Sequence, residues 1–175
     1  MQKGVVRKRK TQALSEYGRQ LKEKQTLRNE YNLREHAFRA YVQKTLQGAR
    51  LKGSAPEMFM RLLETRLDNL VYRAGFAATR AKARQMVSHG HFLVNEKPMN
   101  IPSYGVRAND RVAVKNSSLA SPLFADIQNI WKKFQAPVWI ELDKEHTAVK
   151  VLSLPAMHEV EIGADIPLIF DFYSR

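Results

Sequence analysis

Cationic and hydrogen-bonding side chains recur at helical spacing between residues 66 and 88. They form two groups, one of Arg66, Asn69 and Arg73, the other of Arg80, Arg84 and Ser88. Positions three or four apart share one side of an α-helix, so each group would form a polar stripe along one helix. A corner lined with guanidinium, amide and hydroxyl groups can bind a polyanion by contacting its phosphates, without any reaction chemistry. These six residues are therefore candidate binding residues.

The same stretch offers little for catalysis or for metal binding. His89 and His91 lie two residues apart, but no cysteine or close carboxylate accompanies them, so they make a weak metal pair. No Ser-His-Asp arrangement, phosphate-cradling glycine loop or carboxylate pair stands out in the chain. We expect no enzyme activity, no metal and no cofactor, and we count both histidines among the candidate binding residues.

An ordinary helical hairpin with a solvated charged rim is the alternative interpretation of this stretch. Such a rim normally carries acidic partners, and Asp68 is the only carboxylate between Arg66 and Val94. We therefore expect the arginines to lie exposed and to face an external anion.

A helix must position the first group. Ser54, Pro56 and Glu57 have the pattern of a capping box with proline in the first turn, so a helix is predicted to begin there. It is predicted to contain Arg66 and to end at Gly75, which adopts the left-handed conformation at little cost. One apolar arc of this helix would consist of Phe59, Leu63, Leu67, Leu70 and Ala74.

A second helix must position the second group. Thr79 is a suitable N-cap, and the helix is predicted to run to about His89, with Gly90 ending it. The free N–H groups at its start favour a phosphate, so Thr79 joins the candidate binding residues. Residues 91–94 are predicted to be extended, with a turn at residues 95–97.

The composition favours a polyanionic partner. The chain has 175 residues, a formal net charge of +12 and a pI of about 10.1. The net charge is +10 over residues 1–56, +5 over residues 57–120 and −3 over residues 121–175. We expect the first two-thirds to hold the polyanion by displacing its counterions. The acidic last third is expected to pack on the body or to meet a basic protein.

The sequence disfavours a membrane or secreted location. No apolar run approaches the ~20 residues that span a bilayer, and the basic N-terminus lacks the apolar core of a signal peptide. There is no cysteine, which fits a reducing, cytosol-like compartment.

The first 65 residues are predicted to be helical behind a basic arm. Residues 1–13 are expected to form this arm, in which Arg7, Lys8, Arg9 and Lys10 would meet phosphates; a disordered tail or a localisation signal is the alternative. Ser15 is expected to cap a helix that carries the further candidates Tyr17, Lys22, Lys24 and Arg28. A second helix is predicted from about residue 33 to residue 46, followed by a linker at residues 48–53.

Aromatic residues are interleaved with these cations. Tyr17, Tyr31, Phe38 and Tyr41 could stack on unpaired bases, although side chains of this kind more often fill a core. For Phe38 and Tyr41 we favour the core.

After residue 95 the apolar residues alternate, which is typical of strands. Strands are predicted at residues 98–101, 104–106, 111–115, 139–142 and 147–154, the last two as a hairpin around residues 143–146. A helix is predicted at about residues 119–134, and residues 167–173 are predicted to be extended. Strands gathered in the second half beside helices indicate an α+β fold.

Several motifs resemble one family of RNA-binding proteins. Arg66-Leu67-Asp68-Asn69, Gly75-Phe76, Thr79-Arg80 and residues 87–91 match, in order and spacing, the small RNA-binding domain first described in small-subunit ribosomal protein four. The flanks also resemble that family: residues 15–18, residues 20–25, residues 100–104 and the final residues 172–175. Nearly the whole chain is thus similar to the bacterial-type or organellar family of small-subunit ribosomal protein four.

The resemblance implies a function and partners. It implies primary binding to a multi-helix junction of 16S-type ribosomal RNA early in subunit assembly, in the cytoplasm or in an organelle. It further implies contact with small-subunit protein five, an influence on translational accuracy, and a place near the path by which mRNA enters. In many members a longer first segment, sometimes with four zinc-binding cysteines, precedes the matched part; we expect that segment and any zinc site to be absent here.

The resemblance also implies an organisation into domains. We expect a helical domain at residues 14–65, onto which the tail at about 167–175 packs back, and an RNA-binding domain with a small, mainly antiparallel β-sheet at residues 66–166, with its motif at 66–116. Two alternatives use the same motif: a stand-alone RNA-binding protein of ribosome rescue, and an RNA-binding fragment of an rRNA-modifying enzyme. The matched flanks argue against both.

Overall fold

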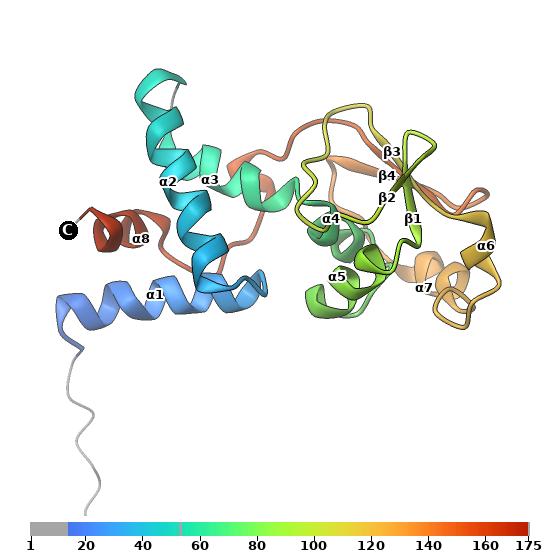
Figure 1. Ribbon diagram of the computed structural model, residues 1–175, viewed down its shortest axis with the longest axis horizontal. Helices are drawn as coiled ribbons and strands as arrows, with labels where there is room; N and C mark the ends of the chain where they lie inside the picture. Colours follow the sequence, from blue (N-terminus) through green and yellow to red (C-terminus); the bar gives the residue numbers. More distant parts are fainter. Residues whose placement is uncertain (1–13, 53, 175) are drawn as a thin grey trace, which may run out of the picture.

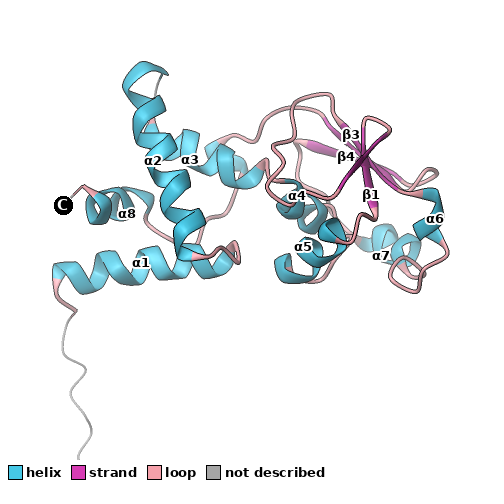
Figure 2. Ribbon diagram, in the orientation of Figure 1, coloured by secondary structure: helices cyan, strands magenta, loops and turns pink. Residues whose placement is uncertain are grey.

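The computed structural model describes residues 14–52 and 54–174, which form a helical part and a mixed part (Figure 1). The helical part contains α1 (Glu16–Glu30), α2 (Glu35–Lys52), α3 (Ala55–Glu64) and the last helix, α8 (Ile166–Tyr173). The mixed part contains α4 (Leu67–Arg73), α5 (Arg80–Ser88), α6 (Asn116–Leu119), α7 (Ile127–Lys133) and a β-sheet (Figure 2). The strands pair in one antiparallel sheet and do not alternate regularly with helices, which confirms the predicted α+β class.

Five short strands make one antiparallel sheet in the order β2-β1-β3-β5-β4. They are β1 (Phe92–Val94), β2 (Lys97–Met99), β3 (Arg111–Val114), β4 (Ile140–Asp143) and β5 (Ala148–Val151). Asn95 and Glu96 join β1 to β2 with φ angles of 48° and 68°, the left-handed pair that a two-residue hairpin requires. The hairpin predicted around residues 143–146 is present as β4 and β5.

Each of the two parts has its own hydrophobic core. One core joins one face of the sheet to helices α4, α5 and α7, with Trp131 and Trp139 fully buried in it. The other joins α1, α2, α3 and α8 around Phe38 and Phe59. The predicted apolar arc is buried throughout, but Phe59 and Leu63 belong to the second core whereas Leu67, Leu70 and Ala74 belong to the first.

The prediction of one helix through Arg66 to Gly75 is wrong, because the helix is interrupted at residues 65 and 66. Arg66 has the extended angles φ −65° and ψ 141°. The carbonyl groups of Tyr104 and Pro102 accept the N–H groups of Leu67 and Asp68, at 2.8 and 3.1 Å. A loop from later in the chain thus replaces helical partners at the start of α4. The capping box also fails, since Ser54 makes no side-chain bond to the helix.

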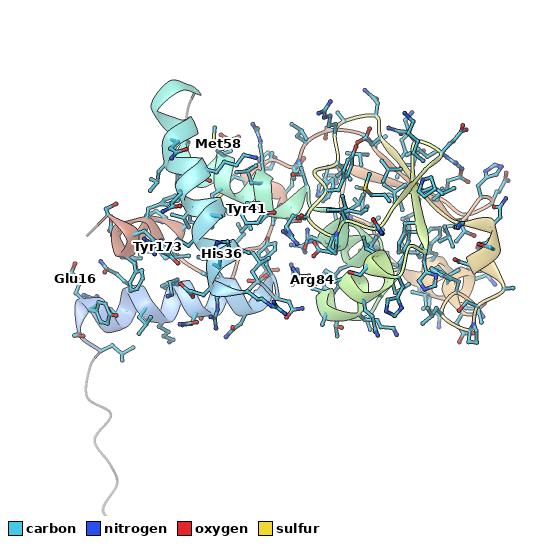
Figure 3. The ribbon with its side chains drawn as sticks, viewed as in Figure 1. Glu16, His36, Tyr41, Met58, Arg84 and Tyr173 are labelled. Carbon is cyan, nitrogen blue, oxygen red and sulfur yellow. The ribbon has the colours of Figure 1, made fainter. Side chains whose placement is uncertain are left out.

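The predicted linker at residues 48–53 is wrong as well, because α2 continues to Lys52. Gly48 lies inside the helix, and a Cβ built on it would come within 2.9 Å of the Met58 sulfur. This glycine lets α2 approach Met58 of α3, which is labelled in Figure 3, and it does not end a helix.

Three expectations for the second half need correction. Residues 104–106 form no strand but a single bridge between Gly105 and Arg66. Residues 119–134 contain the end of α6, turns and the short α7 in place of one helix. The tail is the helix α8 and not extended, because Asp165 caps it, accepting from the N–H of Leu168 at 3.3 Å, and Pro167 lies in its first turn. This tail packs against α1, and the hydroxyl of Tyr173 donates to Glu35 of α2 at 2.9 Å.

Candidate nucleic-acid interface

The turn between α4 and α5 has the predicted geometry. Gly75 and Gly90 have φ angles of 75° and 74°, the left-handed conformation that ends each helix. Thr79 accepts the N–H of Lys82 on its hydroxyl at 3.2 Å and so caps α5. Local sequence signals therefore fix the end of α4 and both ends of α5.

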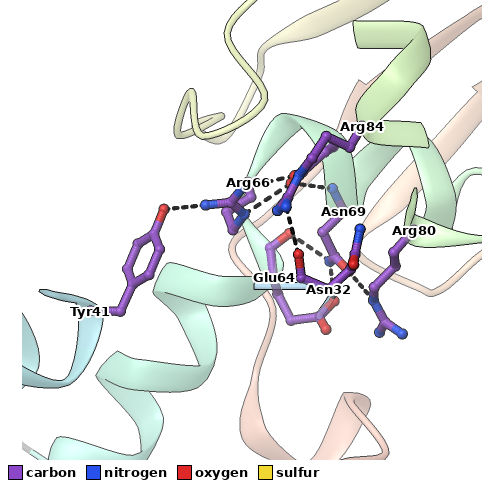
Figure 4. Close-up of polar contacts among 8 residues, drawn as sticks. Asn32, Tyr41, Glu64, Arg66, Asn69, Arg80 and Arg84 are labelled. Atoms are coloured by element: carbon purple, nitrogen blue, oxygen red, sulfur yellow. Dashed lines mark hydrogen bonds and ion pairs between the residues drawn. The ribbon is translucent and has the colours of Figure 1, made fainter. Parts of the chain in front are cut away.

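Arg66 and Asp68 form a buried pair. The guanidinium Nε and Nη2 of Arg66 donate to the two carboxylate oxygens of Asp68 at 2.9 and 2.7 Å, and each residue is 4% exposed. A third donor, Nη1, bonds the hydroxyl of Tyr41 at 2.5 Å. The expectation that Arg66 lies on an exposed flank is wrong: its side chain ties α4 to α2 (Figure 4).

The carboxylate of Glu64 is the centre of a second buried cluster. It is fully buried and accepts from Arg73 at 2.8 and 3.0 Å, from Asn69 at 3.0 Å and from the hydroxyl of Tyr31. Burial, and then the charge of Glu64, raise the pKa of Tyr31. Burial alone would lower the pKa of Arg73, but the hydrogen bonds and charge of Glu64 have the larger combined effect, so the pKa of Arg73 is raised. Asn69 is 2% exposed, so its expected place on a binding surface is wrong, and Tyr31 is 3% exposed, so its ring lies in the interior and not where a base could stack.

Arg80 and Arg84 join α5 to the end of α1. Arg80 donates from Nε to the Oδ1 of Asn69 at 2.8 Å and lies 3.6 Å from the carboxylate of Glu30. Arg84 bonds Asp68 at 2.9 Å and the carbonyl oxygen of Asn32 at 2.5 Å. Figure 3 shows Arg84 where the two parts of the molecule meet, and Figure 4 shows the bonds.

The expectation that these arginines lack acidic partners is therefore wrong. Four guanidinium groups face three carboxylates, and two of these, Glu30 and Glu64, lie before the stretch in which partners were sought. A flat helical projection places these side chains on an exposed rim. The packing of α1 and α3 against α4 and α5 brings them together. This cluster of Glu30, Glu64, Arg66, Asp68, Asn69, Arg73, Arg80 and Arg84 is called the junction network below.

The outward face of α5 carries a different set of side chains. Lys82, Gln85, Ser88 and His89 are exposed and follow one another at helical spacing. Sequence reasoning selected Ser88 and His89 but missed Lys82, although its spacing to both was visible. Lys82 makes one weak bond, to Gln85 at 3.4 Å, so its charge is available to a partner.

His91 lies at the edge of this face, just after α5. It is half-buried, and its Nδ1 is 3.0 Å from the hydroxyl of Ser118. Partial burial, His89 and Lys82 lower the pKa of His91. Three basic groups are thus close to one another, which is a suitable environment for an anion.

Helix α1 divides its candidate residues between surface and interior. Lys22 is exposed, and so is Tyr17, whose ring lies 5.6 Å from that of Phe172. Lys24, in contrast, is 6% exposed and bonds Glu35 at 2.9 Å, so its expected surface role is wrong. Arg28 is half-buried and also bonds Glu35, at 3.3 Å.

Three further expectations concern other residues. Phe38 is fully buried in the core, as favoured, and Tyr41 is half-buried against the same core. The expected cations Arg7, Lys8, Arg9 and Lys10 lie outside the described residues. Over residues 14–52 and 54–174, no helix has the length and apolarity to cross a membrane, and no three potential ligands gather to hold a metal ion.

Two family models together match residues 1–112. The S4 domain matches residues 65–112, and the Ribosomal protein S4/S9 N-terminal domain matches residues 1–64. The second match lies outside the motif that several RNA-binding protein types share. It therefore favours the ribosomal interpretation over a rescue protein or an enzyme fragment.

Relatives over the length of the chain agree with both matches. The small ribosomal subunit protein uS4 of Persephonella marina is 45% identical over 99% of this chain and 83% of its own length. The proteins of the same name from Natranaerobius thermophilus and Caldicellulosiruptor saccharolyticus are 42% and 43% identical over 92% and 93% of this chain, and over 76% of their own lengths. The chain belongs to the uS4 family. It is a structural ribosomal protein of the small subunit and not an enzyme.

The candidate residues of α4 and α5 in this uS4 chain thus fall into two structural classes. Arg66, Asn69, Arg73, Arg80 and Arg84 are bound within the junction network. Thr79, Ser88 and His89 lie on the exposed face of α5, with Lys82 beside them and the half-buried His91 at the edge. The sequence suggested a single binding surface. In the structure one set of these residues joins the two folded parts, and the other set lies on the exposed face of α5.

Proposed function

We propose that this uS4 chain is a primary binder of small-subunit ribosomal RNA and recognises the shape of a junction between several RNA helices. The observation that carries this is the junction network, which ties α5 to α1, α2 and α3. A protein that docks on folded RNA needs its cations at fixed separations, because phosphates in a junction are fixed too. If the two domains moved independently, binding would have to order them, and the lost conformational entropy would weaken the affinity.

The exposed face of α5 is the proposed centre of the contact. Lys82 would neutralise a phosphate, the hydroxyls of Thr79 and Ser88 would donate to phosphate or ribose oxygens, and His89 and His91 would add charge when protonated. On α1, Lys22 and the exposed Arg19 supply further cations, and Tyr17 an exposed ring. Arg7, Lys8, Arg9 and Lys10 are proposed to follow the RNA backbone from the N-terminal side.

The interior arginines have a different proposed role. Arg66 and Asn69, which are buried, hold the scaffold without touching RNA, and Arg73, whose side chain is 22% exposed, holds it through Glu64. Arg80 and Arg84 have side chains that are 12% and 28% exposed, so their free edges would add to the potential at the surface and position α5. Early binding of such a scaffold would nucleate subunit assembly.

Protein partners are proposed for the acidic C-terminal third. The exposed carboxylates include Glu141, Glu145 and Glu161, which would suit a basic neighbour such as small-subunit protein five. Through that contact the chain would influence translational accuracy, and its basic part would lie near the path by which mRNA enters.

The test is binding to purified 16S-type ribosomal RNA in competition with bulk nucleic acid at physiological ionic strength. We expect selective binding and a footprint confined to one compact junction. Equal affinity for bulk nucleic acid, or protection scattered along the RNA, would refute the proposal.

A further inference from the structure

A hollow of about 440 Å³ opens between α4, the turn after it and the segment that follows α7. Its walls include the half-buried rings of Tyr72 and Phe134, with Ala77, Ala78 and the exposed Ile130 around them. The volume falls within the range of small-ligand sites, roughly 300–1,000 Å³.

Fixed contacts keep this region in shape. The indole N–H of Trp131 in α7 donates to the carbonyl oxygen of Ala74 at 2.8 Å. Gly75 lies against Phe134, whose ring atoms come within 3.2 Å of the place where a Cβ would be. The ring of Phe134 is thus held by the turn between α4 and α5, and the hollow is preformed.

The surroundings of the hollow are cationic. Among the described residues no carboxylate lines it, and the charged residue in its lining is Arg73, which also bonds Glu64. Lys132 and Lys133, both exposed, immediately precede Phe134, and Thr79 and Arg80 immediately follow Ala78 at the positive end of α5. An apolar, aromatic hollow between two basic segments is complementary to one base of a strand whose phosphates lie on either side.

We propose that this hollow binds one unpaired nucleobase of the ribosomal RNA, an inference that rests on the proposed function. The base would stack against Tyr72 or Phe134, and the amide of the exposed Gln135, which can both donate and accept, would bond its edge. The flanking phosphates would lie toward Lys132 and Lys133 on one side and the start of α5 on the other. An apolar side chain of a neighbouring protein would use the apolar walls but neither the amide nor the cations.

The first test compares two fluorescent probes, an oligoadenylate and an abasic ribose-phosphate oligomer of equal length and charge. The intact chain is expected to bind the oligoadenylate about tenfold more tightly, because stacking of one base is worth roughly that factor. Ala78→Leu, which fills the hollow from its exposed rim, should lower this preference at least threefold. Ala125→Leu, at an exposed alanine elsewhere, should not change it.

A second variant tests whether a lost preference could come from unfolding of the chain. Phe134→Leu keeps an apolar side chain but removes the ring, and it too should reduce the preference while the thermal transition stays cooperative. Photocrosslinking of the chain to ribosomal RNA should then yield a peptide that contains Tyr72 or Phe134.

Opposite results have distinct meanings. If the chain selects ribosomal RNA but both variants keep the full preference for oligoadenylate, the hollow does not bind a base and the proposed function stands. Crosslinks from this region to a neighbouring protein, and none to RNA, would likewise overturn the base site. If ribosomal RNA is not selected at all, the proposed function itself fails.

Discussion

The guanidinium carbon of Arg80 lies 4.5 Å from the ring centre of Tyr31. The same carbon is 4.5 Å from the ring centre of Tyr72, so one arginine of α5 contacts an aromatic ring from each part of the molecule. Arg80 is also bonded to Asn69 and near Glu30. These contacts make Arg80 a fastening between the two parts.

Replacing Arg80 is therefore predicted to destabilise the fold. Arg80→Ala removes two cation–π contacts and a charged hydrogen bond, which together should lower the free energy of unfolding by about 3 kcal/mol. Arg80→Lys should lose much of the same stability, because an ammonium group lacks the planar fork. Urea denaturation measures both. Loss of less than about 0.5 kcal/mol in Arg80→Ala would contradict this role for the residue.

Lys82, two residues later on the outward face of α5, is predicted to behave in the opposite way. Lys82→Ala should leave the urea transition within about 0.5 kcal/mol of the parent chain, as is usual for exposed sites. It should reduce the slope of log affinity for ribosomal RNA against log salt by about one, because one phosphate contact is lost. Lys144→Ala, in the exposed turn between β4 and β5, is the matched control and should change neither quantity. An unchanged slope in Lys82→Ala would remove Lys82 from the interface.

The sequence sufficed for the turn between α4 and α5 because its signals are local. Gly75, Thr79 and Gly90 each act within four residues of their own position, by a left-handed φ angle or by a cap. The same holds for the hairpin at Asn95 and Glu96. Signals of this range are visible without the rest of the chain.

The roles of the arginines could not be predicted because their partners are distant in sequence. Tyr31 reaches Glu64 and Arg80 only after α1 has packed beside α3 and α5. The break at Arg66 likewise depends on carbonyl groups of residues 102 and 104. Helical projection predicts which side chains share a flank. It does not predict whether solvent or another helix covers that flank.

Glu64 offers a sharp test of the buried charges. Glu64→Gln keeps the size of the side chain but removes the carboxylate that pairs with the guanidinium of Arg73. Residue 64 has no solvent exposure, so water cannot replace the lost partner. Breaking a buried pair in this way should cost about 3–5 kcal/mol of stability. The matched control is Glu57→Gln, which loses an exposed i, i+4 pair with Arg61 and should cost about 0.5 kcal/mol or less. Equal effects of the two changes in thermal or urea denaturation would contradict the assignment of Glu64.

The two left-handed glycines provide a second matched pair. A Cβ at Gly90 would meet no atom within 4 Å, so Gly90→Ala should cost only the backbone strain of about 1–2 kcal/mol. Gly75→Ala adds a contact at 3.2 Å with the ring of Phe134, and the ring must move to relieve it. Gly75→Ala is therefore predicted to be the more destabilising, and to weaken oligoadenylate binding if the hollow holds a base. If Gly90→Ala were the more destabilising change, the ring of Phe134 would be shown to move aside at little cost in free energy.

His91 predicts how RNA binding depends on pH. Partial burial, His89 and Lys82 lower its pKa, so the free chain holds this proton less tightly than the unfolded chain does. Its contribution to stability is therefore present above about pH 6.5 and is lost as the pH falls from there through the lowered pKa. A bound phosphate would favour the protonated ring, so affinity for ribosomal RNA should rise as the pH falls from about 8 to about 6. This rise should shrink in His91→Asn and persist in His158→Asn, at an exposed histidine of the short 3-10 helix Met157–Glu159. Titrations of RNA affinity that rise equally in both variants would exclude His91 from the contact.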